Sequence, residues 1–277
     1  MMTIGIVGLG LIGGSFAKSF KANTDHRILG LDTDIDVMTM AALSGAVDGA
    51  LTAETLGGCD VVLAALPPAA LLDWAEINGR YLTGTIVVDL CGVKREICRR
   101  ISACAGENGF VYVGGHPMAG KEVGGFSNAS AALFSGATMI LTPEAGTDIG
   151  TLDRLKQLFT AAGFDSILFS DPESHDRIIA YTSALPHVIS SAFVKSPAML
   201  RRKGFTAGSF RDITRVAQLD ENLWTELFLM NSDNLADELA LLIENLTPYL
   251  DALRRGDAEK LRGLLREGRE CRAAAGG

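Results

Sequence analysis

Short apolar runs bounded by glycine, proline or aspartate recur along the chain as far as Asp171. Successive positions within each run are apolar, which is typical of strands in a parallel sheet that is covered on both faces. The pattern predicts strands at Thr3–Val7, Arg27–Leu31, Val61–Leu66, Thr85–Asp89, Phe110–Val113, Thr138–Leu141 and Ser166–Phe169.

The segments between these runs carry apolar residues at helical spacing, for example in Ile12–Ala22, Ile35–Leu43 and Leu152–Ala162. Strands that alternate with helices in this way indicate an α/β fold, with helices on both faces of one sheet. We therefore expect residues 1–171 to form an N-terminal Rossmann-type domain with a doubly wound parallel sheet.

From Pro172 onward no strand is predicted, and we expect residues 172–277 to form an all-α C-terminal domain. Asp220 and Asp257 lie where helix N-caps are needed, and Gly256 lies where a helix would end. The predicted helices are Glu173–Lys195, Gly208–Gln218, Glu221–Met230, Ser232–Arg254 and Asp257–Cys271.

The helix predicted at Ser232–Arg254 carries a continuous apolar stripe. Such a stripe either packs in the core of its own domain or forms an interface between two copies of the chain. The stripe consists of Leu235, Leu239, Leu242, Ile243 and Leu246.

The composition narrows the class of protein. Of 277 residues, 48% are hydrophobic and 21% are charged, which is typical of a soluble globular protein long enough for two domains. The formal net charge of −8 disfavours nucleic acid or an anionic membrane as a partner. No apolar run reaches the length of a membrane-spanning helix.

The five cysteines argue against a metal site. None forms a CxxC pair, and none lies near a histidine at the spacing of zinc ligands. We therefore expect no bound metal and a reducing compartment, which favours a cytoplasmic location. The apolar stretch Ile4–Phe16 has no basic leader and contains glycines, so we interpret it as a strand and a turn instead of a signal peptide.

A glycine-rich turn follows the first predicted strand and opens the first helix. Its sequence is Gly8-Leu9-Gly10-Leu11-Ile12-Gly13. Its glycines permit a tight turn, a close approach of the backbone to a pyrophosphate, and close packing of helix on strand. A turn without a ligand is the alternative, but the strand–turn–helix context predicts a dinucleotide site.

Asp32 ends the second predicted strand and indicates which dinucleotide binds. Its carboxylate can accept hydrogen bonds from the two ribose hydroxyls and would repel a 2′-phosphate, so NAD is favoured over NADP. We interpret Asp34 and Asp36 as caps of the next helix. Leu66 ends the strand predicted from Val61 and Pro67 follows it, and we expect both to border the cofactor.

His116 follows a predicted strand, within the sequence GGHPMAGKE, and should lie at the carboxyl edge of the sheet, where ligands of such folds bind. A histidine has an ordinary pKa of about 6.5, so it can accept the proton that a hydroxyl loses during hydride removal. A histidine that only braces the loop is the alternative. His26 is interpreted as a surface residue, and His175 as structural or solvated.

A second group of polar residues lies in the predicted helical domain. His187 ends the sequence SALPH within a helix, where a lone histidine is more often structural. Arg211 and Arg215 are four residues apart, so they lie on one helix face, and the planar fork of arginine matches a carboxylate. A solvated basic face paired with Asp212 and Asp220 is the alternative.

Four motifs occur in the order in which they are found in prephenate and arogenate dehydrogenases, and the chain resembles this family over essentially its whole length. The motifs are GLGLIGGS, GGHPMAGKE, SALPH and FRDITRVA, the last with Trp224 downstream. GGHPMAG and FRDITR are specific to the family, whereas the glycine motif is not. The resemblance implies an NAD(P)-binding domain followed by a helical dimerisation domain, with the substrate between them and a homodimer as the assembly.

The resemblance also implies roles for single residues. The catalytic histidine, which binds the C4 hydroxyl of the substrate ring, corresponds to His116. The arginine that holds the ring carboxylate corresponds to Arg215, and the histidine near the pyruvyl side chain corresponds to His187. The remaining residues implied in the pocket are Arg211, Asp212, Trp224 and Glu122.

One position departs from the family pattern. Many members have a serine after the fifth strand that hydrogen-bonds the catalytic histidine or the substrate hydroxyl, and Gly92 stands at that position here. Lys94 of the same motif is present, and we expect it either to contact the substrate or to cap the sheet edge.

We therefore expect an NAD-dependent oxidoreductase that converts prephenate to 4-hydroxyphenylpyruvate in tyrosine biosynthesis, by hydride transfer and loss of carbon dioxide. Arogenate, which has an amino group in place of the keto group, is the alternative substrate and would give tyrosine directly. Another dehydrogenase of the same architecture, or a non-catalytic NAD-binding module, are the remaining alternatives.

Overall fold

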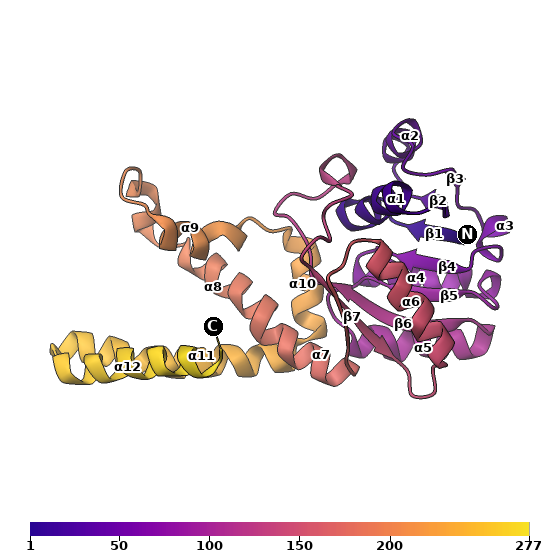
Figure 1. Ribbon diagram of the computed structural model, residues 1–277. Helices are drawn as coiled ribbons and strands as arrows, with labels where there is room; N and C mark the ends of the chain where they lie inside the picture. Colours follow the sequence, from indigo (N-terminus) through magenta and orange to yellow (C-terminus); the bar gives the residue numbers. More distant parts are fainter. Residues whose placement is uncertain (277) are drawn as a thin grey trace.

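A sheet of eight strands organises the N-terminal part of residues 1–276, which the computed structural model describes (Figure 1). The strands lie side by side in the order β3-β2-β1-β4-β5-β6-β7-β8. Their bounds are β1 (Thr3–Val7), β2 (Arg27–Leu31), β3 (Gly49–Ala50), β4 (Val61–Ala64), β5 (Ile86–Asp89), β6 (Val111–Pro117), β7 (Thr138–Pro143) and β8 (Ser166–Phe169).

Each predicted strand is present, with small shifts at the ends. The strand β3 was not predicted, because Gly49 and Ala50 form no apolar run. The strand β6 continues past its predicted end at Val113, because its last residues pair with β7, where His116 lies opposite Ile140.

The prediction of a wholly parallel sheet is wrong for β6 and β7, which pair antiparallel. A parallel connection needs a crossover, usually a helix, and between these two strands the described chain has only the short 3-10 turn η2 (Phe126–Asn128). The prediction of burial on both faces also fails at the edge strand β8, where Leu168 and Phe169 are 53% and 45% exposed.

Helices cover both faces of the sheet, so the doubly wound arrangement is confirmed. On one face α1, α2 and α6 pack around an aromatic cluster in which the ring centroids of Phe16 and Phe134 lie 4.2 Å apart. On the other face α4 and α5 bury Leu71 and Ile97. The helices of this part are α1 (Leu11–Asn23), α2 (Ile35–Leu43), α3 (Ala53–Leu56), α4 (Pro68–Asn78), α5 (Arg95–Asn108) and α6 (Ile149–Ala161).

The chain after Phe169 is helical wherever it forms regular structure within the described residues, as predicted. Asp220 and Asp257 cap their helices as expected, and Gly256 ends α11 with a φ of +66°. The predicted helix at Glu173–Lys195 is interrupted by a π-helical turn. The elements are α7 (Pro172–Ile179), the π turn η3 (Ala180–Ala184), α8 (Leu185–Phe193), η4 (Pro197–Arg201), α9 (Gly208–Thr214), η5 (Arg215–Ala217), α10 (Glu221–Met230), α11 (Ser232–Arg255) and α12 (Ala258–Ala274).

Two arms extend from the sheet, one made of α8 and α9 and the other of α11 and α12 (Figure 1). The apolar stripe on α11 divides along its length. Leu235 is buried in a small cluster with α8 residues, whereas Ile243 and Leu246 are 56% and 55% exposed. Core packing therefore accounts for only the first half of the stripe. Among the described helices, none has the length and apolar character needed to cross a membrane.

Candidate active site

The glycine-rich turn lies at the carboxyl edge of β1, and its three glycines differ in what surrounds them. Gly8 has a φ of +81°, and a Cβ built on it would lie 2.4 Å from the carbonyl oxygen of Ala65. A Cβ on Gly13 would lie 1.9 Å from the carbonyl oxygen of Gly8. A Cβ on Gly10 would meet nothing within 4 Å. The protein's own packing therefore explains Gly8 and Gly13, whereas the open space at Gly10 fits the close approach of a ligand.

The other predicted cofactor residues lie around this turn. The carboxylate of Asp32 accepts hydrogen bonds from the backbone N–H groups of Leu9 at 2.7 Å and Asp34 at 3.0 Å, which holds it beside the glycines. The side chain of Leu66 lies next to Gly8, and Pro67 is the exposed N-cap of α4. The helix α1 begins at Leu11, followed by Ile12, without a side-chain cap, so its first N–H groups are available to a phosphate. These residues fit a dinucleotide.

The acidic residues after Asp32 differ in their roles. Asp34 caps α2 by accepting a hydrogen bond from the N–H of Asp36 at 2.8 Å, as expected. Asp36 lies in the first turn of the helix and is not its cap.

His116 lies near the end of β6 and is half-buried. Its Nδ1 is hydrogen-bonded to Nε2 of His175 at 2.9 Å, and Nδ1 of His175 is in turn hydrogen-bonded to Oδ1 of Asp176 at 2.8 Å. The interpretation of His175 as solvated is therefore wrong, since His175 is buried and contacts the predicted catalytic residue. Burial, together with the charges of His175 and Lys94, lowers the pKa of His116 well below its ordinary value.

The opposite nitrogen of the His116 ring, Nε2, lies beside the loop that follows β5. A Cβ built on Gly92 would lie 3.9 Å from this nitrogen and 3.5 Å from the Leu227 side chain of α10. The loop after β5, the end of β6 and α10 therefore meet at His116. Gly92 leaves this nitrogen without a neighbouring hydroxyl from the loop.

Lys94 lies beneath the site and not within it. Its ammonium group is paired with the carboxylate of Asp89, and both side chains are fully buried. Asp89 also accepts a hydrogen bond from the hydroxyl of Tyr112 at 2.7 Å. Burial alone would lower the pKa of Lys94, but the charge of Asp89 outweighs it and the pKa is raised. Of the two roles expected for Lys94, the structure therefore supports the structural role at the sheet edge and not the contact with the substrate.

Four of the residues expected around the substrate contact one another in two pairs. The rings of His187 and Trp224 have centroids 3.7 Å apart, and Nδ1 of His187 is hydrogen-bonded to the carbonyl oxygen of Val216 at 3.1 Å. Nη1 of Arg215 lies 2.6 Å from Oε1 of Glu122, which belongs to the loop between β6 and β7. Because the helical part carries Arg215, this ion pair joins the two parts of the chain.

Arg211 and Asp212 are exposed on α9. Neither side chain forms an ion pair or a side-chain hydrogen bond within the part of the chain that the structure describes. Among the described residues, neither side chain therefore contacts another predicted site residue, and the alternative of a basic face paired with Asp212 and Asp220 is not observed either.

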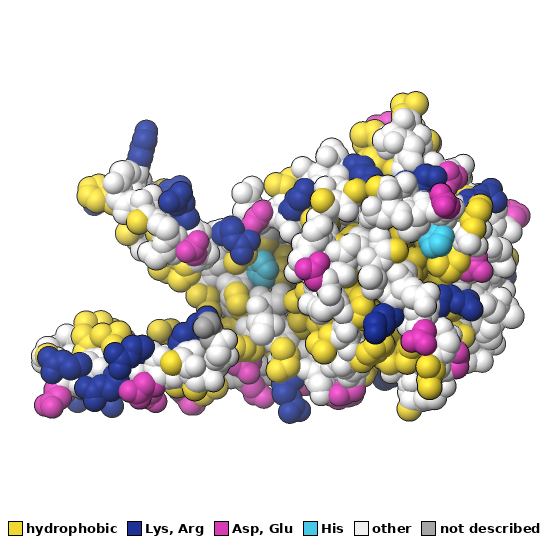
Figure 2. All heavy atoms as spheres, in the orientation of Figure 1, with side chains coloured by type: hydrophobic (Ala, Val, Ile, Leu, Met, Phe, Trp, Pro, Cys, Tyr) yellow, Lys and Arg dark blue, Asp and Glu magenta, His cyan; other side chains and the backbone are white. Residues whose placement is uncertain are grey.

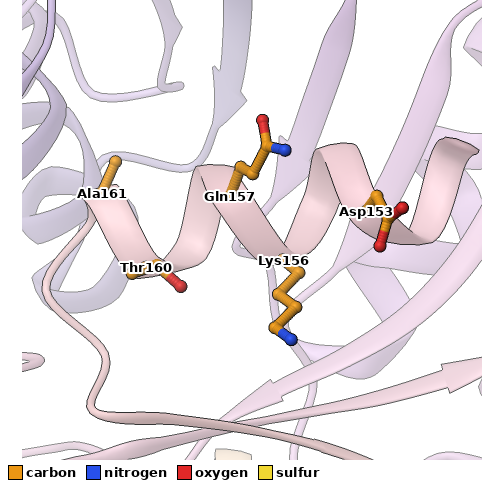
Figure 3. A pocket seen from close by; sticks show the side chains of 5 residues that line it. All are labelled: Asp153, Lys156, Gln157, Thr160 and Ala161. Carbon is orange, nitrogen blue, oxygen red and sulfur yellow. The ribbon is translucent and has the colours of Figure 1, made fainter.

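A surface hollow lies elsewhere, along α6, and all of its lining residues come from that one helix (Figure 3). It contains no residue of the site around His116. Within residues 1–276, no group of three or more histidine, cysteine, aspartate or glutamate side chains is arranged to hold a metal ion.

Known proteins of similar sequence and structure cover nearly the whole chain. Prephenate dehydrogenase of Bacillus subtilis is 29% identical over 94% of this chain and 72% of its own length. The structure of Aquifex aeolicus prephenate dehydrogenase with hydroxyphenyl propionate and NAD+ has a TM-score of 0.87 and 28% identity, covering 99% of this chain and 98% of the other. Synechocystis arogenate dehydrogenase has a TM-score of 0.81 and 27% identity, covering 99% and 100%.

Two family models match consecutive parts of the chain. The model of the prephenate dehydrogenase nucleotide-binding domain matches residues 16–168, and that of the prephenate dehydrogenase dimerization domain matches residues 171–267. The first match covers the sheet-containing part from within α1 to β8, and the second covers the helical part with His187 and Arg215. The chain therefore belongs to the prephenate dehydrogenase family.

Proposed function

We propose that this protein oxidises prephenate with NAD and releases 4-hydroxyphenylpyruvate and carbon dioxide. The observation that carries the proposal is the position of His116. It stands at the sheet edge that the glycine-rich turn shares, and α10 of the helical part packs beside it. Substrate held there would lie between a dinucleotide and a titratable base.

The residues that would hold the cofactor are those of the turn from Gly8 to Gly13, together with Asp32, Leu66 and Pro67. NAD supplies the acceptor for the hydride that leaves C4 of the substrate ring. Asp32 would bind the ribose hydroxyls, and its charge would oppose the 2′-phosphate of NADP. The similar Aquifex aeolicus structure contains NAD+, which supports this assignment.

His116 would accept the proton of the C4 hydroxyl as the hydride departs. A general base must be unprotonated before it can act, and the lowered pKa keeps His116 neutral near pH 7. Loss of the ring carboxylate as carbon dioxide then gives an aromatic ring, so the protein's task is to orient the substrate and move one proton.

Arg215 would bind the ring carboxylate through its guanidinium group, which is largely exposed. This group pairs with Glu122, so a substrate carboxylate would have to replace or share that contact. His187 and Trp224 would line the side-chain end of the pocket, and Arg211 and Asp212 its outer rim. Lys94 would act only by neutralising Asp89 below the site.

Arogenate is the second candidate substrate, because an arogenate dehydrogenase is among the similar structures. The two substrates differ only in the keto or amino group of the side chain. The test is NADH or NADPH formation by the purified protein with prephenate and with arogenate, each with NAD and with NADP. We expect the highest kcat/KM with prephenate and NAD. A preference for arogenate would replace the substrate, and no turnover of either would contradict the proposal.

We also propose that the protein forms a homodimer through a domain that comprises residues 172–277, following a dinucleotide domain of residues 1–171. The described part of α12 has no buried residue, and α11 has only Leu235 and Ala252. Hydrophobic side chains gather along the facing edges of the two arms (Figure 2). The exposed ones on α11 and α12 include Leu241, Ile243, Leu246, Leu250, Leu253 and Leu265. A second copy would cover these surfaces, which fits the dimerization-domain model.

The location that we propose is the cytoplasm. All five cysteines are free thiols, and three of them are buried in the sheet-containing part. Free thiols are typical of proteins that work in a reducing compartment.

A further inference from the structure

His116, His175 and Asp176 form a hydrogen-bonded chain of three side chains. The direction of each hydrogen bond in it follows from Asp176, which stands at its end. An ionised carboxylate can only accept hydrogen bonds, so Nδ1 of His175 must carry the hydrogen and donate to Asp176. A neutral histidine has one N–H group, so Nε2 of His175 is then an acceptor. Nδ1 of His116 must therefore donate to it.

This order leaves Nε2 of His116 without a hydrogen and with a free lone pair. That nitrogen is the one that lies beside Gly92 and α10, on the side of the ring away from His175. We propose that His175 and Asp176 are positioning residues that fix the tautomer of His116, so that its Nε2 presents a lone pair to the substrate hydroxyl. The proposal rests on the proposed function, in which His116 removes the hydroxyl proton.

The premise that both histidines are neutral has its own physical basis. Burial lowers the pKa of His175, and the pull of Asp176 in the other direction does not fully offset it. Burial is also the main cause of the lowered pKa of His116, and a positive charge on either ring would oppose one on the other. Two adjacent buried rings can therefore share at most one added proton at neutral pH.

The same chain would stabilise the product of proton transfer. When the substrate O–H bond breaks, the proton forms an N–H bond at Nε2 of His116, and the ring becomes positively charged. Its Nδ1–H already donates to His175, and the far side of His175 faces the carboxylate of Asp176. The positive charge therefore develops at one end of a hydrogen-bonded chain that ends in a negative charge.

Asp176 is held firmly enough to set this order. Its two carboxylate oxygens accept hydrogen bonds from the backbone N–H groups of Lys94 at 2.7 Å and Arg95 at 2.9 Å. Nδ2 of Asn231 donates to its backbone carbonyl oxygen at 2.7 Å. Lys94 and Arg95 belong to the start of α5, whereas Asp176 and Asn231 belong to the helical part. The tautomer of His116 is therefore set only when the two parts are docked.

Nitrogen chemical shifts of the histidine rings test the proposal without any substrate. The chain has only four histidines, so single substitutions of His26, His175 and His187 assign the signals of His116 in protein labelled with nitrogen-15 histidine. We expect protonated Nδ1 and unprotonated Nε2 at His116 near neutral pH. A hydrogen on Nε2 of His116 in the folded wild-type protein would overturn the proposal.

Three variants connect the tautomer to the rate. His175→Phe removes the acceptor but keeps a ring, and Asp176→Asn can present a donor to His175 and reverse the order. For both variants we expect kcat to fall by up to about 10²-fold and the KM for NAD to change little. We also expect a mixed or reversed tautomer of His116. His175→Gln keeps a carbonyl acceptor for Nδ1 of His116 and should recover part of the loss. His26→Gln serves as the control, because His26 is not part of the hydrogen-bonded series His116–His175–Asp176.

The outcomes separate this proposal from the proposed function. If folded His175→Phe keeps the wild-type kcat and His116 tautomer, the proposal is wrong and His175 has only a structural role. If the two variants fail to fold, the wild-type spectrum still decides the tautomer. If the spectrum is as expected but the wild-type protein turns over neither prephenate nor arogenate, the positioning chain stands and the proposed function fails.

Discussion

Nη1 of Arg215 lies 2.6 Å from Oε1 of Glu122, although the two residues come from different parts of the chain. Both side chains are substantially exposed, at 65% and 40%. An exposed ion pair contributes little to stability, roughly 0–1 kcal/mol, because water and salt screen it. We therefore propose a functional role for this ion pair, which would hold the guanidinium group where a substrate carboxylate binds.

We predict that Arg215→Ala raises the KM for prephenate by about 10- to 100-fold, since a hydrogen bond to a charged group contributes about 1.5–3 kcal/mol. Glu122→Gln should change KM by no more than about fivefold, because it removes only the exposed ion pair. Steady-state kinetics of both variants provide the measurement, with Arg99→Ala as the control, since Arg99 pairs with Glu96 on the surface of α5. An unchanged KM in Arg215→Ala would exclude this arginine from carboxylate binding.

The glycine-rich turn gives a prediction that separates folding from binding. Gly10→Ala should fold normally, because its Cβ meets nothing within 4 Å, yet it should weaken NAD binding at least about tenfold by filling the space of the pyrophosphate. Gly13→Ala should destabilise the protein itself, because its Cβ would lie 1.9 Å from the carbonyl oxygen of Gly8. Thermal unfolding and calorimetric titration with NAD measure the two effects. Wild-type NAD affinity in Gly10→Ala would place the cofactor elsewhere.

Strands and helix caps could be predicted from local patterns. Apolar runs predict the strands. Asp220, Gly256 and Asp257 predict helix ends, and each lies at a helix end in the structure. His116 and Arg215 could be proposed as site residues because each lies in a specific motif, and their roles stay predictions. The reversal at β7 was missed, although the lack of a predicted helix before Thr138 was a signal for it.

The pair His175–Asp176 could not be predicted in the same way. His175 lies on a helix outside any motif that we used, and its contact with His116 joins residues 59 positions apart. Such a contact depends on how the helical part docks on the sheet, which no local pattern encodes. An adjacent histidine and aspartate soon after the helix cap Asp171 were the available signal. The choice between the two roles expected for Lys94 depends on the fold for a related reason, because only the fold shows that its side chain pairs with Asp89 beneath the site.

The lowered pKa values of His116 and His175 predict how stability depends on pH. As pH falls below about 6.5, the unfolded chain binds protons at these histidines while the folded protein does not, so the free energy of unfolding decreases. The contribution of the two neutral histidines to the free energy of unfolding is fully present above about pH 6.5. It is lost as the pH falls toward the pKa values of these histidines in the folded protein. Urea unfolding at about pH 7.5 and about pH 5.5 measures the loss. His116→Gln should show a smaller loss than the wild-type protein, and an equal loss would contradict the lowered pKa.

The exposed half of the α11 stripe predicts the assembly. Ile243→Glu and Leu246→Glu should each shift the protein from dimer toward monomer, because a charge would be buried at the interface without a partner. Leu43→Glu is the matched control, since Leu43 is equally apolar and 84% exposed on α2, in the sheet-containing part. Light scattering during size-exclusion chromatography gives the mass. A wild-type monomer, or variants that remain dimeric, would remove the stripe from the interface.

The most direct test of the central claim compares the wild-type protein with His116→Gln in NADH formation from prephenate. A positioned general base contributes typically about 10²–10⁴-fold, so kcat of the variant should fall by that factor. The affinity for NAD should be unchanged, because His116 lies outside the glycine-rich turn and Asp32. Rapid wild-type turnover with this loss in the variant is the predicted result. Equal turnover by a folded His116→Gln variant would contradict the account, because proton removal would then not depend on His116.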